Sequence, residues 1–174
     1  MRRRGAGVFK RGPLAGVWVL GGAKPLVQPF VSTIINKLDA KGRVSVPAPF
    51  RQILAQQNLH GVYCIPSFVS PALEAFGETL LAQVQERLKN FDPLFSEDYD
   101  IQAQAVLGQT QFLNLDDEGR VRIPEDLLAH AGIVERVLFV GLDVKFQIWD
   151  PARFEPVQRE RLARARAVRS GGNP

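Results

Sequence analysis

The sequence has only one cysteine and two histidines in 174 residues, and this scarcity excludes several classes of protein. Cys64 alone cannot form an intrachain disulfide or a cysteine-based zinc site, and His60 and His130 are too few for a transition-metal centre. Long apolar runs are also missing, because no stretch reaches the roughly 18 residues needed to span a bilayer. We therefore expect a soluble protein of a reducing compartment, with no metal, no cofactor and no membrane partner.

The net charge of +4 is unevenly distributed along the chain. Residues 1–30 carry six basic and no acidic residues, whereas residues 151–174 carry six Arg and two Glu. The 120 residues between them have a net charge of −6, and only their first third, residues 31–70, is basic. A general affinity of the whole chain for nucleic acid is therefore not expected, and any such site must be local.

The N-terminal 30 residues combine a basic start with a short apolar run from Leu14 to Leu20, as secretory signal peptides do. Gly16 interrupts this run, and the segment shows no helical or strand periodicity. Over export we favour a disordered basic extension, or sequence translated upstream of the true start.

An internal repeat dominates the rest of the chain. Residues 38–47, LDAKGRVSVP, recur 77 residues later as residues 115–124, LDDEGRVRIP. The similarity continues after small shifts, since residues 62–65 parallel residues 137–140, and the segment ending at Phe76 parallels the one ending at Trp149. The pattern predicts two copies of one structural unit.

The first unit begins with β-branched, roughly alternating segments over residues 33–38 and 44–46, which predict two strands. Residues 39–42 supply turn chemistry between them, because Asp bonds its own backbone and Gly permits a positive φ. Pro47 ends the second strand, and a short amphipathic helix is predicted over Phe50–Gln57.

The remaining segments complete a two-repeat α+β protein. A helix over residues 124–131 matches the first one. Residues 72–76 alone would permit a helix, but their counterpart, residues 145–149, alternates, so both are predicted as strands. Residues 77–108 are typical of an acidic helical link, and Pro151 starts a C-terminal helix with a basic end.

The candidate site is the Asp-x-x-x-Arg turn, which occurs twice. A purely structural role, with Asp pairing with its own Arg, explains one such turn well but the second less well. A catalytic pair of Asp39 and Asp116 is disfavoured, because basic neighbours favour the ionised carboxylates. A phosphate-binding glycine loop and a nucleophile with a His partner are also lacking, so neither an enzyme nor a small-molecule substrate is predicted.

DNA binding is the third interpretation, because a two-stranded β-ribbon fits the major groove and Arg can contact guanine or phosphate. The predicted DNA contacts are Lys37, Lys41, Arg43, Arg120 and Arg122. The predicted turn-structuring residues are Asp39, Gly42, Asp116 and Gly119. The acidic remainder of the chain would repel DNA from other surfaces.

The two turn motifs, together with residues 139–141 and 145–149, resemble the MraZ family of bacterial transcriptional regulators from Val31 to Arg169. This resemblance implies two tandem AbrB-type swapped-hairpin repeats that form an intrachain pseudo-dimeric β-barrel with peripheral helices. It further implies a ring-shaped homo-oligomer, cytoplasmic and nucleoid-associated. On this resemblance, the partner of the protein would be double-stranded promoter DNA with tandem repeats, and the protein would repress the division and cell-wall gene cluster.

The resemblance also implies domain boundaries. Similar proteins begin near Phe30, which favours a mis-assigned start for this chain. The predicted parts are an extension over 1–30, repeat one over 31–80, a helical linker over 81–108, repeat two over 109–153, and a basic C-terminal helix and tail over 154–174.

Repeat two departs from repeat one in charge, since Asp117 and Glu118 replace Ala40 and Lys41. Acidic groups beside phosphates cost roughly 1 kcal/mol or more per close contact. We therefore expect repeat one to dominate DNA contact and repeat two to serve mainly barrel and ring formation. The alternative function is a ring-forming interaction scaffold, or an antitoxin-like partner-binding protein, that does not bind promoter DNA specifically.

Other prominent residues are expected to have ordinary structural roles. Arg51 and Arg136 are predicted to be solvated surface, which is also the alternative role for Lys37. Cys64 and Phe68 are expected in the core, and Trp149 is expected to anchor the core or a subunit interface.

Overall fold

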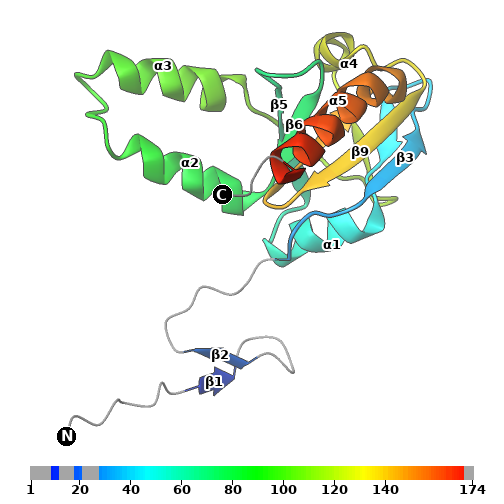
Figure 1. The fold of residues 1–174 in the computed structure, drawn as a ribbon. Coiled ribbons are helices and arrows are strands. Elements are labelled where there is room, and N and C mark those ends of the chain that lie inside the picture. The colour runs from blue at the N-terminus through cyan, green and yellow to red at the C-terminus, as the bar shows by residue number, and fades with distance from the viewer. Residues whose placement is uncertain (1–8, 12–17, 21–27, 171–174) are drawn as a thin grey trace, which may run out of the picture.

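The computed structural model describes residues 9–11, 18–20 and 28–170, whose arrangement is shown in Figure 1. The elements in chain order are β1 (Phe9–Arg11), β2 (Trp18–Leu20), β3 (Thr33–Lys37), β4 (Arg43–Ser45), α1 (Ala48–Gln56), β5 (Gly61–Pro66), β6 (Leu73–Phe76), α2 (Glu78–Leu88), α3 (Glu97–Val106), the 3-10 turn η1 (Leu107–Gln109), β7 (Gln111–Asn114), β8 (Arg120–Arg122), α4 (Glu125–Ala131), β9 (Arg136–Leu142), β10 (Lys145–Trp149) and α5 (Pro151–Ser170). The predicted α+β class is confirmed. The predicted N-terminal extension lies mostly outside the described residues, and within it β1 pairs antiparallel with β2.

The main sheet has six antiparallel strands in the order β3-β9-β10-β6-β5-β7. This order is symmetric. The counterparts of β3, β5 and β6 in the other half of the chain are β7, β9 and β10, and exchanging each strand for its counterpart gives the same order read from the opposite edge. At the centre of the sheet Gln147 lies opposite Glu74, and these two positions are equivalent in the internal repeat. The sheet therefore has a pseudo-twofold axis between β6 and β10.

A separate two-stranded ribbon joins β4 to β8 across the two halves. Val44 pairs with Val121, and both side chains are buried. These valines are equivalent positions 77 residues apart, so the register of the ribbon is symmetric about this pair. The main sheet and the ribbon are distinct among the described residues, and the closed barrel stays a prediction.

Helix α1 begins two residues earlier than predicted because proline is well tolerated in a first helical turn, where its missing N–H has no intrahelical role. The helix follows Pro47 and carries Pro49 near its start. Its buried face consists of Phe50, Ile53 and Leu54, as the amphipathic pattern indicated. In the second half, α4 is closed by Gly132 in a left-handed conformation with φ of 65°.

The core is built around Phe50, whose side chain is 0% exposed. Its ring centroid lies 5.4 Å from that of Phe30 and 4.9 Å from that of Phe146. Phe139 contacts the same ring edge-on at 6.5 Å. This cluster joins the residues before β3, the first helix and both central strands of the second half into one hydrophobic core.

Trp149 lies in a second, smaller apolar cluster with Phe154, which attaches α5 to the sheet. Cys64 is buried as expected, and burial raises the pKa of its thiol to about 12. The expectation for Phe68 was wrong, because its side chain is 66% exposed. Phe68 lies beyond the end of β5, in the segment before β6, where the chain has left the sheet.

A polar network occupies the centre of the sheet. The carboxylate of Glu74 accepts hydrogen bonds from Ser67 Oγ at 2.7 Å and from Gln147 Nε2 at 2.8 Å. Lys145 Nζ forms an ion pair with the other carboxylate oxygen at 2.8 Å. Trp149 Nε1 donates to Gln147 Oε1, so the network satisfies most of the polar groups that the sheet buries.

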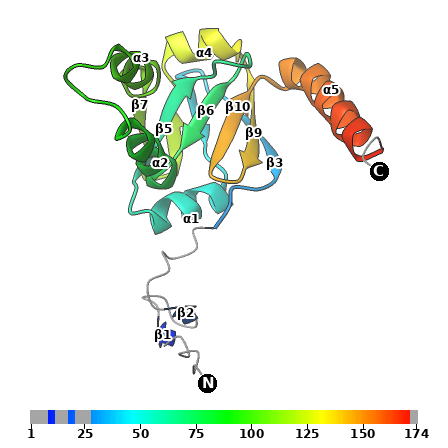
Figure 2. The same ribbon diagram turned by 60° about the vertical axis from the view of Figure 1, so that its left-hand side comes forward.

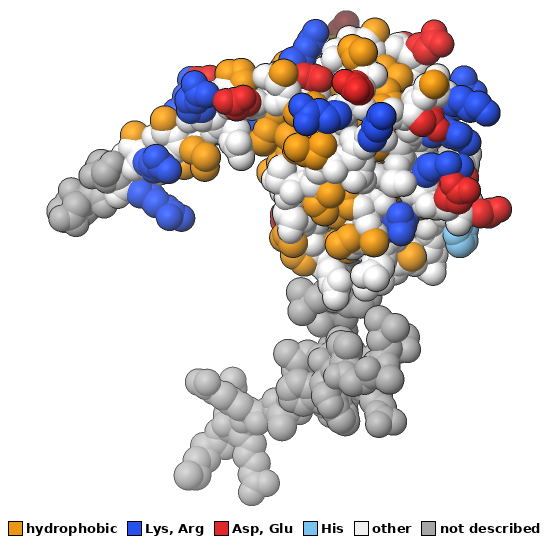
Figure 3. All heavy atoms as spheres, turned by 90° about the vertical axis from the view of Figure 1, so that its right-hand side faces the viewer, with side chains coloured by type: hydrophobic (Ala, Val, Ile, Leu, Met, Phe, Trp, Pro, Cys, Tyr) orange, Lys and Arg blue, Asp and Glu red, His pale blue; other side chains and the backbone are white. Residues whose placement is uncertain are grey.

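The peripheral helices leave the sheet on opposite sides, with the α2–α3 pair on one side and α5 on the other (Figure 2). The surface of α5 carries several basic side chains with acidic ones among them, and the body also shows both charges intermixed (Figure 3). Within the described ranges, no helix is both long and apolar enough to cross a membrane.

Candidate nucleic-acid interface

Turn one, residues 39–43, is held by the side chain of Asp39. Its Oδ1 accepts hydrogen bonds from the backbone N–H groups of Lys41 and Arg43, each at 2.8 Å. Its Oδ2 accepts a hydrogen bond from Arg43 Nε at 2.7 Å, which is also an ion pair. Gly42 adopts a φ of 74°, a conformation that strongly favours glycine.

Turn two, residues 116–120, has nearly the same geometry. Asp116 Oδ1 accepts from the N–H groups of Glu118 and Arg120 at 3.0 and 2.9 Å, and Oδ2 accepts from Arg120 Nε at 2.9 Å. Gly119 has a φ of 75°. The two motifs thus build the same turn, in which each aspartate bonds the backbone and orients its arginine.

These bonds alter the ionisation of the turns. The backbone N–H of Arg43 lowers the pKa of Asp39, and that of Arg120 lowers the pKa of Asp116. The hydrogen bond that the Arg120 side chain donates to Asp116 raises the pKa of Arg120. Both aspartates are therefore held as carboxylates, the state that accepts three hydrogen bonds.

Acidification is expected to loosen both turns. Because the folded-state pKa of Asp39 is lowered, its stabilising contribution is complete above the ordinary pKa of 3.8 and is lost as the pH falls through the lowered value. NMR titration of the Lys41 and Arg43 amide protons should give a midpoint below 3.8. The titration should vanish in Asp39→Asn, and a midpoint at or above 3.8 would contradict the turn geometry.

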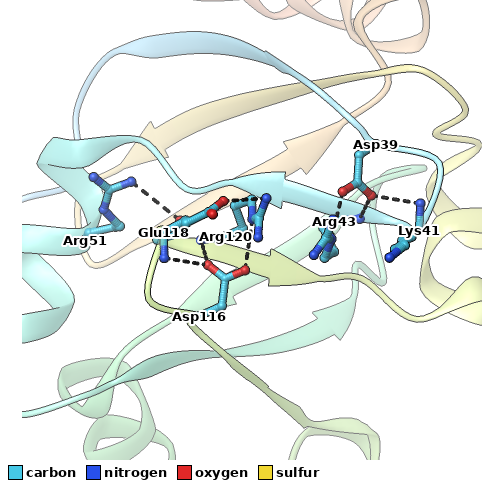
Figure 4. A network of polar contacts seen from close by, with 8 residues as sticks. Asp39, Lys41, Arg43, Arg51, Asp116, Glu118 and Arg120 are labelled. Atoms are coloured by element: carbon cyan, nitrogen blue, oxygen red, sulfur yellow. Dashed lines mark hydrogen bonds and ion pairs between the residues drawn. The ribbon is translucent and has the colours of Figure 1, made fainter.

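The two turns lie at opposite ends of the β4–β8 ribbon (Figure 4). Arg122 lies opposite Arg43 across this ribbon, and Lys41 is exposed within turn one. A groove of about 780 Å³ runs beside turn one, and its charged lining residues are Lys41 and Arg122 together with the acidic Asp39 and Glu125. The end of the ribbon at turn one therefore collects three of the predicted DNA contacts, one of which comes from the second half of the chain.

The surroundings of turn two are less basic. Arg120 lies opposite the neutral Ser45, and its Nη1 forms an ion pair with Glu118. Glu118 occupies the position that Lys41 holds in turn one. The side chains of Arg43 and Arg120 are 32% and 27% exposed, so both reach solvent while bound to their aspartates. Lys37 lies outside the ribbon, at the end of β3, where its register partner on β9 is Arg136.

Arg51 belongs to this region although the sequence analysis placed it on the solvated surface, and that expectation was wrong. It is half-buried, and its Nη1 donates to Val46 O at 2.8 Å and to Gly119 O at 3.5 Å. The sequence did carry a signal, because the position 77 residues later is Leu128, an apolar residue. A residue at a position equivalent to a partly buried leucine is expected to pack against the protein and not to extend fully into solvent.

Among the described residues no cluster of His, Cys, Asp and Glu is arranged to hold a metal ion. The fold and the site define an α+β protein with an internal pseudo-twofold, which presents two Asp–Arg turns along one β-ribbon. The family model that matches residues 106–169 is described as "MraZ protein, putative antitoxin-like".

Similar proteins extend this match over most of the chain. The protein named Transcriptional regulator MraZ from Xanthobacter autotrophicus is 44% identical over 140 residues, covering 80% of this chain and 88% of its own. The one from Azorhizobium caulinodans is 46% identical over 137 residues, covering 79% and 84%. The one from Rickettsia canadensis is 40% identical over 126 residues, covering 72% and 84%. The chain belongs to the MraZ family.

Proposed function

We propose that this protein is a sequence-specific DNA-binding transcriptional regulator that acts as a repressor of the division and cell-wall gene cluster. The observation that carries the proposal is the basic end of the ribbon, where Arg43 faces Arg122 and Lys41 is exposed beside them. A two-stranded ribbon with arginines at its end has the dimensions and donors to contact base edges in the major groove. The names of the similar proteins support the regulatory role.

The proposal includes the architecture and assembly that the family resemblance implies. The symmetric exchange of strands between the two halves supports AbrB-type swapped-hairpin repeats that form a pseudo-dimeric barrel. Copies of the chain would assemble head to tail into a ring, in which repeated turns meet tandem promoter repeats. Such a protein acts in the cytoplasm, associated with the nucleoid.

A gel-shift titration with the DNA upstream of its own gene tests this function. Excess scrambled DNA should not displace the protein, because base contacts distinguish the two sequences. Raising the salt concentration should weaken binding without removing this preference. If operator and scrambled DNA compete equally well for the protein, binding is nonspecific and is carried by the basic N- and C-terminal segments of the chain. That result would overturn the proposal.

The second candidate is a ring-forming interaction scaffold or an antitoxin-like partner-binding protein. The antitoxin-like description of the matching family model favours it, as does the ion pairing of both turn arginines with their own aspartates. Pull-down with the product of a small toxin gene next to its own gene, without retention of promoter DNA, would give this function priority.

A further inference from the structure

Arg51 connects the first half of the chain to the turn of the second half. It extends from α1, and its Nη1 reaches the carbonyl oxygens of both Val46 and Gly119. The Gly119 carbonyl also accepts a hydrogen bond from the Val46 N–H at 3.0 Å. Arg51 therefore donates to both carbonyls at the place where the ribbon meets turn two. Figure 4 shows its side chain reaching toward turn two.

The side chain also packs directly over Gly119. A methyl group added at Gly119 would lie 2.5 Å from Arg51 Nη1 and 2.8 Å from its Cδ, so the guanidinium covers the glycine closely. Turn one shares the backbone bond, since its Gly42 carbonyl accepts from the Ile123 N–H, but its nearest side-chain neighbour is Leu128. Of these two equivalent residues, Arg51 thus places a charged guanidinium over turn two, whereas Leu128 places an apolar side chain beside turn one.

We propose that Arg51 is a positioning residue for turn two. It fixes the Gly119 carbonyl and thereby sets the direction in which the next residue, Arg120, leaves the turn. This proposal depends on the proposed DNA-binding function only for its effect on affinity. The effect on the turn itself is independent of DNA.

The contact with Arg51 stabilises turn two, which carries more acidic charge than turn one. Asp116, Asp117 and Glu118 place three acidic side chains in succession, and their mutual repulsion opposes a compact turn. The guanidinium beside Gly119 brings a positive charge to that cluster while its hydrogen bonds hold the backbone. Turn one has Ala40 and Lys41 at the matching positions and reaches the same geometry with an apolar neighbour.

The first test measures the turns of the free protein by amide hydrogen exchange. In Arg51→Leu, which places the repeat-two side chain at the repeat-one position, the Gly119 and Arg120 amides should exchange faster while those of turn one do not. Arg51→Lys should restore part of the protection. The matched control is Arg153→Leu, because Arg153 covers Gly132, at the end of α4, as closely as Arg51 covers Gly119. Equal acceleration in both turns, or none, would overturn the proposal.

The second test is a double-mutant cycle in specific DNA binding. Arg51→Leu should lower affinity by about fivefold, the worth of roughly one net hydrogen bond. In an Arg120→Ala background it should have no further effect, because a residue that acts through Arg120 has nothing left to position. Additive losses would show that Arg51 contacts DNA itself and would contradict positioning. Failure of the unmodified protein to prefer its operator would refute the proposed function, whereas the exchange test would still decide the role of Arg51.

Discussion

Replacing Arg43 by alanine is expected to nearly abolish specific recognition of promoter DNA. Arg43 lies at the basic end of the ribbon opposite Arg122, and a bidentate contact from arginine to guanine contributes about 1–3 kcal/mol of discrimination. Arg43→Lys should recover nonspecific affinity but not sequence preference, because lysine lacks the planar pair of donors. Fluorescence anisotropy with operator and scrambled duplexes measures both quantities.

Arg120→Ala is the matched variant, because Arg120 occupies the equivalent position in an almost identical turn. Its loss of affinity should be smaller than that of Arg43→Ala, since Glu118 pairs with Arg120 and acidic residues surround the turn. Equal losses in the two variants would contradict the predominance of repeat one and indicate that both turns contact DNA alike.

Replacing Phe50 by alanine is expected to have the largest effect on stability. The ring is fully buried and contacts Phe30, Phe139 and Phe146, so its removal leaves a cavity between both halves of the chain. Large-to-small changes at such sites cost about 3–5 kcal/mol in the free energy of unfolding. Urea denaturation followed by circular dichroism measures this loss.

Phe68→Ala is the control for this variant, because the same ring is removed from a largely exposed position. Its free energy of unfolding should change by no more than about 0.5 kcal/mol. A comparable loss in both variants would show that the cluster around Phe50 is not the centre of the core.

Much of this fold could be predicted because the chain contains the same pattern twice. The segment ending at Phe76 was ambiguous alone, and its counterpart ending at Trp149 correctly indicated a strand. The turns were predictable from Asp and Gly at fixed positions, since these residues encode local backbone geometry. The aspartate bonds within each turn follow from the same local chemistry.

The exchange of strands between the halves could not be predicted from the residues alone. Strands that are consecutive in sequence usually pair with each other, whereas here β3 pairs with β9 and β4 with β8. The contacts of Arg51 with Gly119 depend on that exchange, because they join positions 68 residues apart. The exposure of Phe68 was missed for a related reason, since burial of an apolar residue depends on which element covers it.

Chemical-shift mapping of the protein bound to its operator duplex distinguishes the ribbon from the C-terminal helix as the DNA-binding surface. We expect the largest amide shifts on turn one and on Arg122, with smaller shifts on turn two. Shifts confined to the basic residues of α5, with both turns unchanged, would contradict this expectation. DNA binding would then be a property of the C-terminal helix and not of the ribbon.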